Sequence, residues 1–381
     1  MPPHYIVRKF ICPFLSIKPN KIVFDNFGGR GLGDSPMYIA MEILRQELDC
    51  DLVWLVRNMK EPMPKGIRKV KFNSIRSIIE ICTSKVWIDN VKNGILEDKK
   101  KGQYYIQTWH GGGVLLKHVE KAAIDTLTDF DIKITMNDST KIDLILSDNQ
   151  IISDDYKENF WLPPACEIFE HGMPCKDGLY RTQDEILSIK NKIIGGKNVG
   201  IALYAPTFRD DNTYEGYGIN LEQVLNKLER KTKREWVILV RLHPAALKLS
   251  NLFSYGSKII NVTNYSNPMD IVVASDMLIT DYSSISSDFL ILNKPVFILA
   301  LDLNHYQTHC RKLHPYYFSL PYPFAYSNEE LLDAIENFDR EKYLEKTEDY
   351  KRNFLKPFGD GHASEHVVSR IKQVIGFNGK E

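Results

Sequence analysis

Short apolar runs of strand length recur along the whole chain, and helix-like segments lie between them. The runs are almost continuous in valine, isoleucine and leucine, as expected of parallel strands that are buried on both faces. Strands that alternate with helices in this way predict an α/β fold with parallel sheets. The predicted strands are residues 21–27, 51–57, 86–89, 104–109, 143–147 and 167–170 in the first half, and 199–204, 236–242, 258–262, 277–280 and 295–300 in the second.

Glycine, proline and charged residues interrupt this pattern at residues 172–181. A chain of 381 residues has the length of two or three domains, at ~100–200 residues each. We therefore predict two doubly wound, Rossmann-like domains, residues 1–178 and 179–357, that face each other across a cleft. Within the last segment, residues 358–381, a helix near 363–375 is predicted to cross back to the first domain.

Two polar segments follow strand-like runs and carry residues suited to phosphate chemistry. His110 precedes three glycines, which let a ligand approach the backbone, and its ring can take a proton from a hydroxyl at neutral pH. Residues 280–284 have the pattern of a strand end, a turn and a helix start, where Ser283 and Ser284 could hold a diphosphate. Each segment also has a structural explanation: a hydrogen-bonded histidine in a turn, and helix capping by Asp281 or Ser283.

Further polar residues lie at other strand ends. Arg241 and His243 are two apart, so they point to one face and can both donate to phosphate oxygens. Arg209 could meet a phosphate or pair with a neighbouring aspartate, and Asp288 could contact a ribose or serve the helix alone. The glycine-rich residues 28–33 lack the spacing of a dinucleotide fingerprint, so we reject NAD binding and predict a flexible loop that faces an acceptor.

Charge and cysteine content exclude several classes of protein. Basic and acidic residues both number 49, so no overall positive charge favours nucleic acid as a partner. No apolar run approaches the ~18 residues of a membrane span, and the first residues do not resemble a signal peptide. The six cysteines contain no C-x-x-C pair; we expect reduced thiols in a cytosolic protein and no metal site.

Two basic stretches offer a different kind of contact. Residues 1–24 combine four basic and no acidic residues with several large apolar ones, and residues 57–71 hold six basic residues against one acid. Such stretches can hold a protein on an anionic membrane surface. They can equally be a frayed terminus and a solvated loop, and the pattern does not decide between the two.

Five motifs occur in a characteristic order: QTWHG at 107–111, LYAPTFR at 203–209, RLHP at 241–244, TDYSS at 280–284 and DGHASE at 360–365. In this order they resemble the CDP-glycerol glycerophosphotransferase family, the teichoic-acid primases and polymerases with a GT-B fold. The resemblance implies transfer of glycerol phosphate, or a related polyol phosphate, from a CDP-alcohol to a hydroxyl of a membrane-linked or capsular glycan or teichoic acid. The resemblance further implies that CMP is released, that no cofactor is bound, and that the protein works in the cytoplasm or on the inner face of the cell membrane.

The resemblance also implies roles for individual residues. His110 is the candidate general base, and His243 is the second catalytic candidate, which would stabilise charge as CMP leaves. The candidate donor contacts are Arg209, Arg241, Thr280, Asp281, Ser283 and Ser284, and further candidate substrate contacts are Gly111, Gly112 and Asp288.

Some positions depart from the family pattern. Gly112 stands where threonine is usual, Cys175 stands where arginine is usual, and histidines at 305, 309 and 314 occur where an Arg-Gly pair is usual. These departures leave the donor open among CDP-glycerol, CDP-ribitol and other activated groups. Two other functions also remain open: a GT-B glycosyltransferase that uses a nucleotide-sugar, and a non-catalytic scaffold that holds glycan or nucleotide.

Overall fold

The computed structural model describes residues 3–92, 99–110, 120–209 and 213–377. Contacts divide these residues into two compact units. The chain up to Asp177, together with the residues from Pro357 onward, forms the first unit, and Gly178–Lys356 forms the second. No helix in the described ranges combines the length and the apolar character that crossing a bilayer requires.

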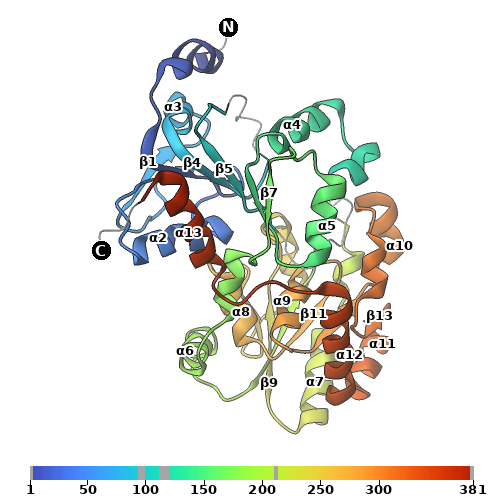
Figure 1. Cartoon of the computed structure of the whole chain (residues 1–381). Coiled ribbons are helices and arrows are strands. Elements are labelled where there is room, and N and C mark those ends of the chain that lie inside the picture. Colours follow the sequence, from blue (N-terminus) through green and yellow to red (C-terminus); the bar gives the residue numbers. More distant parts are fainter. Residues whose placement is uncertain (1–2, 93–98, 111–119, 210–212, 378–381) are drawn as a thin grey trace. The chain divides into compact units, whose positions relative to one another are not determined.

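The first unit is built on a seven-stranded parallel sheet with the order β3-β2-β1-β4-β5-β6-β7 (Figure 1). Its chain order reverses between the neighbours β1 and β4, and ligands of open α/β sheets bind at the carboxyl ends of strands at such a switch point. The strands are β1 (Lys18–Phe24), β2 (Asp51–Val56), β3 (Ile67–Lys71), β4 (Ser84–Asp89), β5 (Tyr104–Gln107), β6 (Leu144–Leu146) and β7 (Glu167–Phe169).

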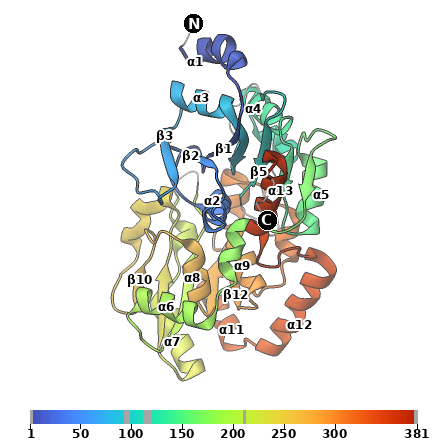
Figure 2. The ribbon, with the colours of Figure 1, turned by 60° about the vertical axis from the view of Figure 1, so that its left-hand side comes forward.

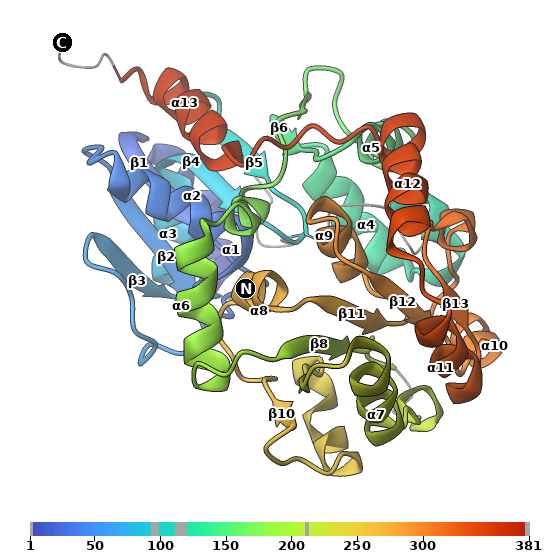
Figure 3. The same ribbon diagram turned by 90° about the horizontal axis from the view of Figure 1, so that it is seen from below.

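Helices cover both faces of this sheet. The helix α13 packs against α2, as two views show (Figures 2 and 3), and Ile39, Ile43 and Ile371 of this pair are fully buried. The Asp177 carboxylate accepts hydrogen bonds from the backbone N–H of Ala363 and of Ser364, which satisfies the first turn of α13. The helical segments are α1 (Pro3–Ile6), η1 (Val7–Ile11), η2 (Cys12–Phe14), α2 (Asp34–Arg45), α3 (Ile75–Thr83), η3 (Glu120–Thr126), α4 (Asp129–Ser139), α5 (Gln150–Asn159), η4 (Pro174–Leu179) and α13 (Ala363–Ile375).

The second unit repeats the same topology in a six-stranded parallel sheet, β10-β9-β8-β11-β12-β13, seen from another side in Figure 3. Its switch point lies between β8 and β11. The strands are β8 (Gly200–Ala205), β9 (Trp236–Val240), β10 (Ile259–Asn261), β11 (Met277–Thr280), β12 (Val296–Leu299) and β13 (Phe324–Ala325). The helical segments are α6 (Gln183–Ile194), η5 (Glu215–Tyr217), α7 (Leu221–Thr232), η6 (Pro244–Leu252), α8 (Pro268–Ala274), α9 (Ile285–Ile291), α10 (Leu303–His305), η7 (Tyr306–Cys310), η8 (Pro315–Ser319), α11 (Asn328–Glu336), α12 (Arg340–Tyr350) and η9 (Lys351–Leu355).

The basic stretch 57–71 is not only a loop, because its last five residues form the edge strand β3. Ile67 and Val70 are buried, whereas Arg68 forms ion pairs with Asp51 and Glu80. Although burial opposes it, hydrogen bonding from Arg68 lowers the pKa of Glu80 to about 2. The alternative of a solvated loop was therefore wrong for this strand, in which two buried apolar residues stand among charged ones, whereas the membrane contact stays a prediction.

The expectation of six reduced thiols was also wrong. Cys12 and Cys82 form a disulfide, with their Cα atoms 5.7 Å apart. The two cysteines are 70 residues apart in the sequence, so no spacing rule could pair them. The other four cysteines form no disulfide in the described structure.

Candidate active site

His110 lies just after β5, which is the neighbour of β4 and so lies next to the switch point of the first sheet. Its Nδ1 is 2.6 Å from the backbone carbonyl oxygen of Asn90, which follows β4. Because a carbonyl oxygen can only accept, Nδ1 carries the hydrogen, and Nε2 of the neutral ring keeps a lone pair. The ring stacks on Trp109 at a centroid distance of 4.9 Å and meets the ring of Phe27 edge-on at 5.2 Å. This geometry leaves Nε2 as the basic nitrogen of a half-buried histidine.

The neighbouring glycine-rich segment is a hydrogen-bonded turn, not the flexible loop that we predicted. The Asp25 carboxylate accepts hydrogen bonds from the backbone N–H of Asn26 at 2.7 Å and of Gly29 at 2.6 Å. Burial raises the pKa of Asp25 to about 6. Gly29 has φ of +83°, and a Cβ there would lie 2.7 Å from Cβ of Phe72, so the turn requires glycine. Its role towards an acceptor stays a prediction.

Thr280 and Asp281 join the two strand ends at the switch point of the second sheet. The Thr280 hydroxyl donates to the carbonyl of Ala205, 2.7 Å away. The Asp281 carboxylate accepts from the backbone N–H of Thr207 at 2.8 Å and of Tyr282 at 2.6 Å. Both side chains are almost completely buried, so the geometry assigns them to holding the loops, in place of the direct donor contact that we predicted.

Arg209 is also turned inward. Its side chain has no exposed surface, and its guanidinium forms ion pairs with Asp281 and Asp302, each at 2.7 Å. The rings of three tyrosines surround the guanidinium at 5.1 to 5.2 Å. Although burial opposes it, the two carboxylates raise the pKa of Arg209, which therefore stays charged. The prediction of a phosphate contact is corrected for this conformation: Arg209 stabilises the loops beneath the strand ends. The three tyrosines are Tyr217, Tyr282 and Tyr306.

Arg241 and His243 differ in their surroundings. Nη1 of Arg241 donates to the carbonyl oxygens of Val262 at 3.0 Å and of Tyr265 at 2.9 Å, and burial lowers the pKa of its guanidinium. His243 is exposed, and its ring stacks on Phe208 at a centroid distance of 5.5 Å. His243 is therefore the more accessible of the two for a donor phosphate.

The remaining predicted residues lie around the start of α9. Ser283 and Ser284 are half-buried, and Ser284 precedes α9 without a side-chain capping bond. Asp288 lies inside α9 and is 8% exposed, which favours a structural role over a ribose contact. Gly111 and Gly112 lie outside the described residues. The second unit thus presents His243, Ser283 and Ser284 as its more accessible candidates.

Sequence reasoning missed several polar residues next to these sites. Asn26 and Asn90 are buried beside His110, and Asp302 is buried beside Arg209. Asn90 and Asp302 follow predicted strands within two residues, and Asn26 lies near the end of the predicted strand 21–27, positions that could have indicated the carboxyl edges of the sheets. Among the described residues, no three histidine, cysteine, aspartate or glutamate side chains gather closely enough to hold a metal ion.

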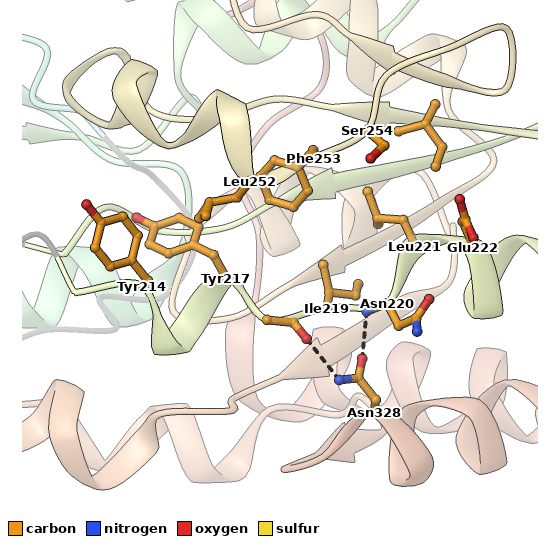
Figure 4. Close-up of a pocket in the computed structure, with 12 residues that line it drawn as sticks. Tyr214, Tyr217, Ile219, Asn220, Leu221, Glu222, Leu252, Phe253, Ser254 and Asn328 are labelled. Carbon is orange, nitrogen blue, oxygen red and sulfur yellow. Dashed lines mark hydrogen bonds between the residues drawn. The ribbon is translucent and has the colours of Figure 1, made fainter.

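The second unit also contains an open pocket of about 450 Å³ beside the start of α7 (Figure 4). Tyr217 and Phe253 lie on its wall, and the Asn328 side chain donates to the carbonyl of Gly218 and accepts from the N–H of Asn220. The Asn328 amide is thus engaged in joining α11 to the start of α7. None of the predicted site residues lines this pocket.

Comparison with known proteins gives a consistent result. A family model for CDP-glycerol:poly(glycerophosphate) glycerophosphotransferase matches residues 7–373. A teichoic acid poly(glycerol phosphate) polymerase of Staphylococcus epidermidis is 29% identical over 372 residues, which are 94% of this chain and 51% of that protein. The chain therefore spans about half the length of that relative. A teichoic acid glycerol-phosphate transferase of Staphylococcus aureus is 27% identical over 374 residues, 94% of each chain.

A solved structure supports the same grouping. A variant of the wall teichoic acid polymerase TagF, soaked with CDPG, matches with a TM-score of 0.82 and 28% identity over 94% of this chain and 90% of that one. The predicted GT-B-like class, with two parallel-sheet Rossmann-like domains, is confirmed by this match and by the two sheets.

Proposed function

Because the chain belongs to the CDP-glycerol:poly(glycerophosphate) glycerophosphotransferase family, we propose that it transfers glycerol phosphate from CDP-glycerol to a hydroxyl of a teichoic acid acceptor and releases CMP. The observation that carries the proposal within the structure is the hydrogen bond from His110 Nδ1 to the carbonyl of Asn90. It leaves Nε2 free of hydrogen and so able to take a proton, which is what a general base requires.

The proposed reaction begins at the acceptor. His110 Nε2 takes the proton of the acceptor hydroxyl while the hydroxyl oxygen attacks the β-phosphorus of CDP-glycerol. A new phosphorus–oxygen bond forms, and the bond from the β-phosphorus to the oxygen shared with CMP breaks. The electron pair leaves with CMP, and the histidinium later returns its proton to solvent.

Groups of the second unit stabilise the donor in this proposal. His243 is exposed and can donate a hydrogen bond to a phosphate oxygen as negative charge grows on the departing CMP. Ser283 and Ser284 lie just after the strand end β11, where backbone N–H groups of a helix start favour anions. The buried Arg209 and Asp281 pair holds this turn in place rather than binding the donor.

Donor turnover tests the proposal directly. Purified protein with a glycolipid acceptor extract would be incubated in parallel with CDP-glycerol, CDP-ribitol and a panel of UDP-sugars. We expect acceptor-dependent CMP release from CDP-glycerol. CMP release only from CDP-ribitol would change the donor and keep the chemistry, whereas UDP release from a sugar nucleotide would identify a glycosyltransferase. No turnover with any donor would leave the scaffold as the explanation.

We also propose that residues 3–14 rest on an anionic membrane surface, from the cytoplasmic side. Phe10 is 54% exposed and shares the short segment η1 with Arg8 and Lys9, and Phe14, which ends the adjoining segment η2, is 85% exposed. Exposed aromatic side chains next to basic side chains favour binding at the interface of a membrane that contains anionic lipids. The paired change Phe10→Ser and Phe14→Ser should reduce sedimentation with phosphatidylglycerol vesicles, and unchanged sedimentation would contradict the proposal.

A further inference from the structure

The side-chain amides of two buried asparagines beside His110 have no part in the mechanism above. Asn90 is fully buried and follows β4, while Asn26 is 5% exposed and follows β1. Nδ2 of Asn90 donates to Oδ1 of Asn26 at 2.8 Å. Nδ2 of Asn26 in turn donates to the carbonyl of Gly31 at 2.9 Å. The pair therefore joins the two strands of the switch point to the glycine-rich turn.

Asn90 reaches the histidine in two ways. Its backbone carbonyl accepts the hydrogen of His110 Nδ1 at 2.6 Å. Its side-chain oxygen accepts from the backbone N–H of Phe27 at 2.8 Å, and the Phe27 ring meets the edge of the His110 ring at 5.2 Å. One residue thus fixes both the hydrogen-bond partner of the imidazole and the aromatic ring beside it.

From this arrangement we infer that Asn90 is a positioning residue, which holds His110 in the Nδ1–H tautomer and in a fixed orientation. The inference rests on the proposed function, in which Nε2 of His110 is the base. The Asn90–Asn26 pair also links the base to the glycine-rich turn, so the geometry of the turn and that of the base depend on the same bonds.

The chemistry of the site favours an amide at position 90. The buried side chain must accept from Phe27 and donate to Asn26 at the same time, and an amide does both without carrying charge. A carboxylate offers no donor, and an apolar side chain leaves the Phe27 N–H and the Asn26 oxygen without these partners in a buried place. Loss of the amide should therefore shift the Asn90 backbone and Phe27, and with them His110.

The tautomer can be observed without any turnover. Protein labelled with ¹⁵N at histidine would be compared with the same protein carrying His110→Gln, which identifies the signal of His110 among the ten histidines. We expect His110 to show a protonated Nδ1 and a bare Nε2 at neutral pH. The opposite tautomer, or a mixture of the two, would overturn the inference even in an active enzyme.

Kinetics of side-chain variants supply the second readout. We expect Asn90→Ala to lower kcat by roughly 10–100-fold while KM for CDP-glycerol stays within about threefold, as for loss of a group that orients a catalytic side chain. The His110 signal should lose its single tautomer. Asn26→Ala should move both readouts in the same direction by less, and it tests the link if Asn90→Ala does not fold.

Asn149→Ala is the matched control, because it also removes a buried asparagine amide after a strand of the same sheet, where it caps α5. It should lower stability and leave the His110 tautomer as it is. The inference would be overturned if Asn90→Ala and Asn26→Ala had the kcat of the wild type. It would also be overturned if the control showed the same change of tautomer. Absence of CMP release from the wild type, with the Nδ1–H tautomer present, would instead refute the proposed function.

Discussion

The two units share one strand topology, yet their switch points are held by different forces. In the first unit, one backbone carbonyl holds His110, and the uncharged side chains of Asn26 and Asn90 bond to each other beside it. In the second unit, a buried arginine is neutralised by Asp281 and Asp302. The same strand topology can thus position a titratable base with uncharged amides in one unit, here called the neutral network, and stabilise loops with a buried ion-pair network in the other.

The two kinds of support respond differently to damage. A buried ion pair that loses one partner leaves an uncompensated charge, at a cost of about 3–5 kcal/mol. A buried amide that loses its partner costs about 1–3 kcal/mol. Stability should therefore depend more on the charged network, and the geometry of catalysis more on the neutral one.

The largest effect on stability is expected from Asp302→Ala. It removes one of the two carboxylates that neutralise Arg209, and the free energy of unfolding should fall by about 3–5 kcal/mol, measured by urea denaturation. Glu345→Ala, at an exposed acidic position of the same unit, should change it by less than about 0.5 kcal/mol. A loss below about 1 kcal/mol for Asp302→Ala would show that the network does not support the unit.

The buried carboxyl group of Asp25, in the turn beside the neutral network, should make the stability of the first unit depend on pH. Burial raises its pKa to about 6 in the folded protein, whereas an unfolded aspartate titrates near ~3.9. Between these two pH values the folded state therefore holds more protons than the unfolded state. The stabilisation that comes from protonated Asp25 is complete below about pH 4 and is lost as the pH rises through about 6. Over that window the loss should be roughly 2–3 kcal/mol.

Asp25→Asn keeps an oxygen that can accept from Asn26 and Gly29, and it removes this titration. Unfolding measured between pH 4 and 7 should therefore show a smaller decline for the variant than for the wild type. If the free energy of unfolding fell equally with pH in both proteins, the decline could not be assigned to Asp25.

The affinity for CDP-glycerol tests the role of His243 in the second unit. His243→Ala should weaken CDP-glycerol binding by about tenfold or more, since a hydrogen bond to a charged group contributes ~1.5–3 kcal/mol. Calorimetry measures the change. Glu345→Ala, at an exposed position of that unit, is the control and should bind the donor as the wild type does. Equal affinity for all three proteins would remove His243 from the donor site.

Helix capping should give the smallest effect. Asp177 accepts from the first N–H groups of α13, and Asp177→Ala should cost about 1–2 kcal/mol in the first unit. Asp339 caps α12 of the second unit from an exposed position, so Asp339→Ala should cost less. Thermal unfolding of both variants measures the difference, and a larger loss for Asp339→Ala would reverse the expected order.

Much of the fold was readable from the sequence because buried parallel strands are continuous apolar runs. Each of the eleven predicted strands overlaps a strand of the structure, and the helix Ala363–Ile375 has the predicted bounds. The edge strands β3 and β13 escaped, since β3 is mostly charged and β13 is two residues long. The cysteine pair escaped because its partners meet only in the folded chain.

The places of the candidate residues in the fold were predictable, but the directions of their side chains were not. The motifs placed His110 and residues 280–284 at strand ends, where the structure has them. Whether a charged side chain points outward to a ligand or inward to a partner depends on residues far away in the chain. Arg209 illustrates this, because Asp302 lies 93 residues away from it.

In the proposed reaction, His110 should serve the chemical step rather than donor binding. The measurement is CMP release and CDP-glycerol affinity for His110→Ala beside the wild type. We predict that CMP release falls by about 10²–10⁴-fold while donor affinity stays within several-fold, because a general base acts mainly in the transition state. CMP release close to that of the wild type, or a loss of affinity as large as the loss of turnover, would contradict it.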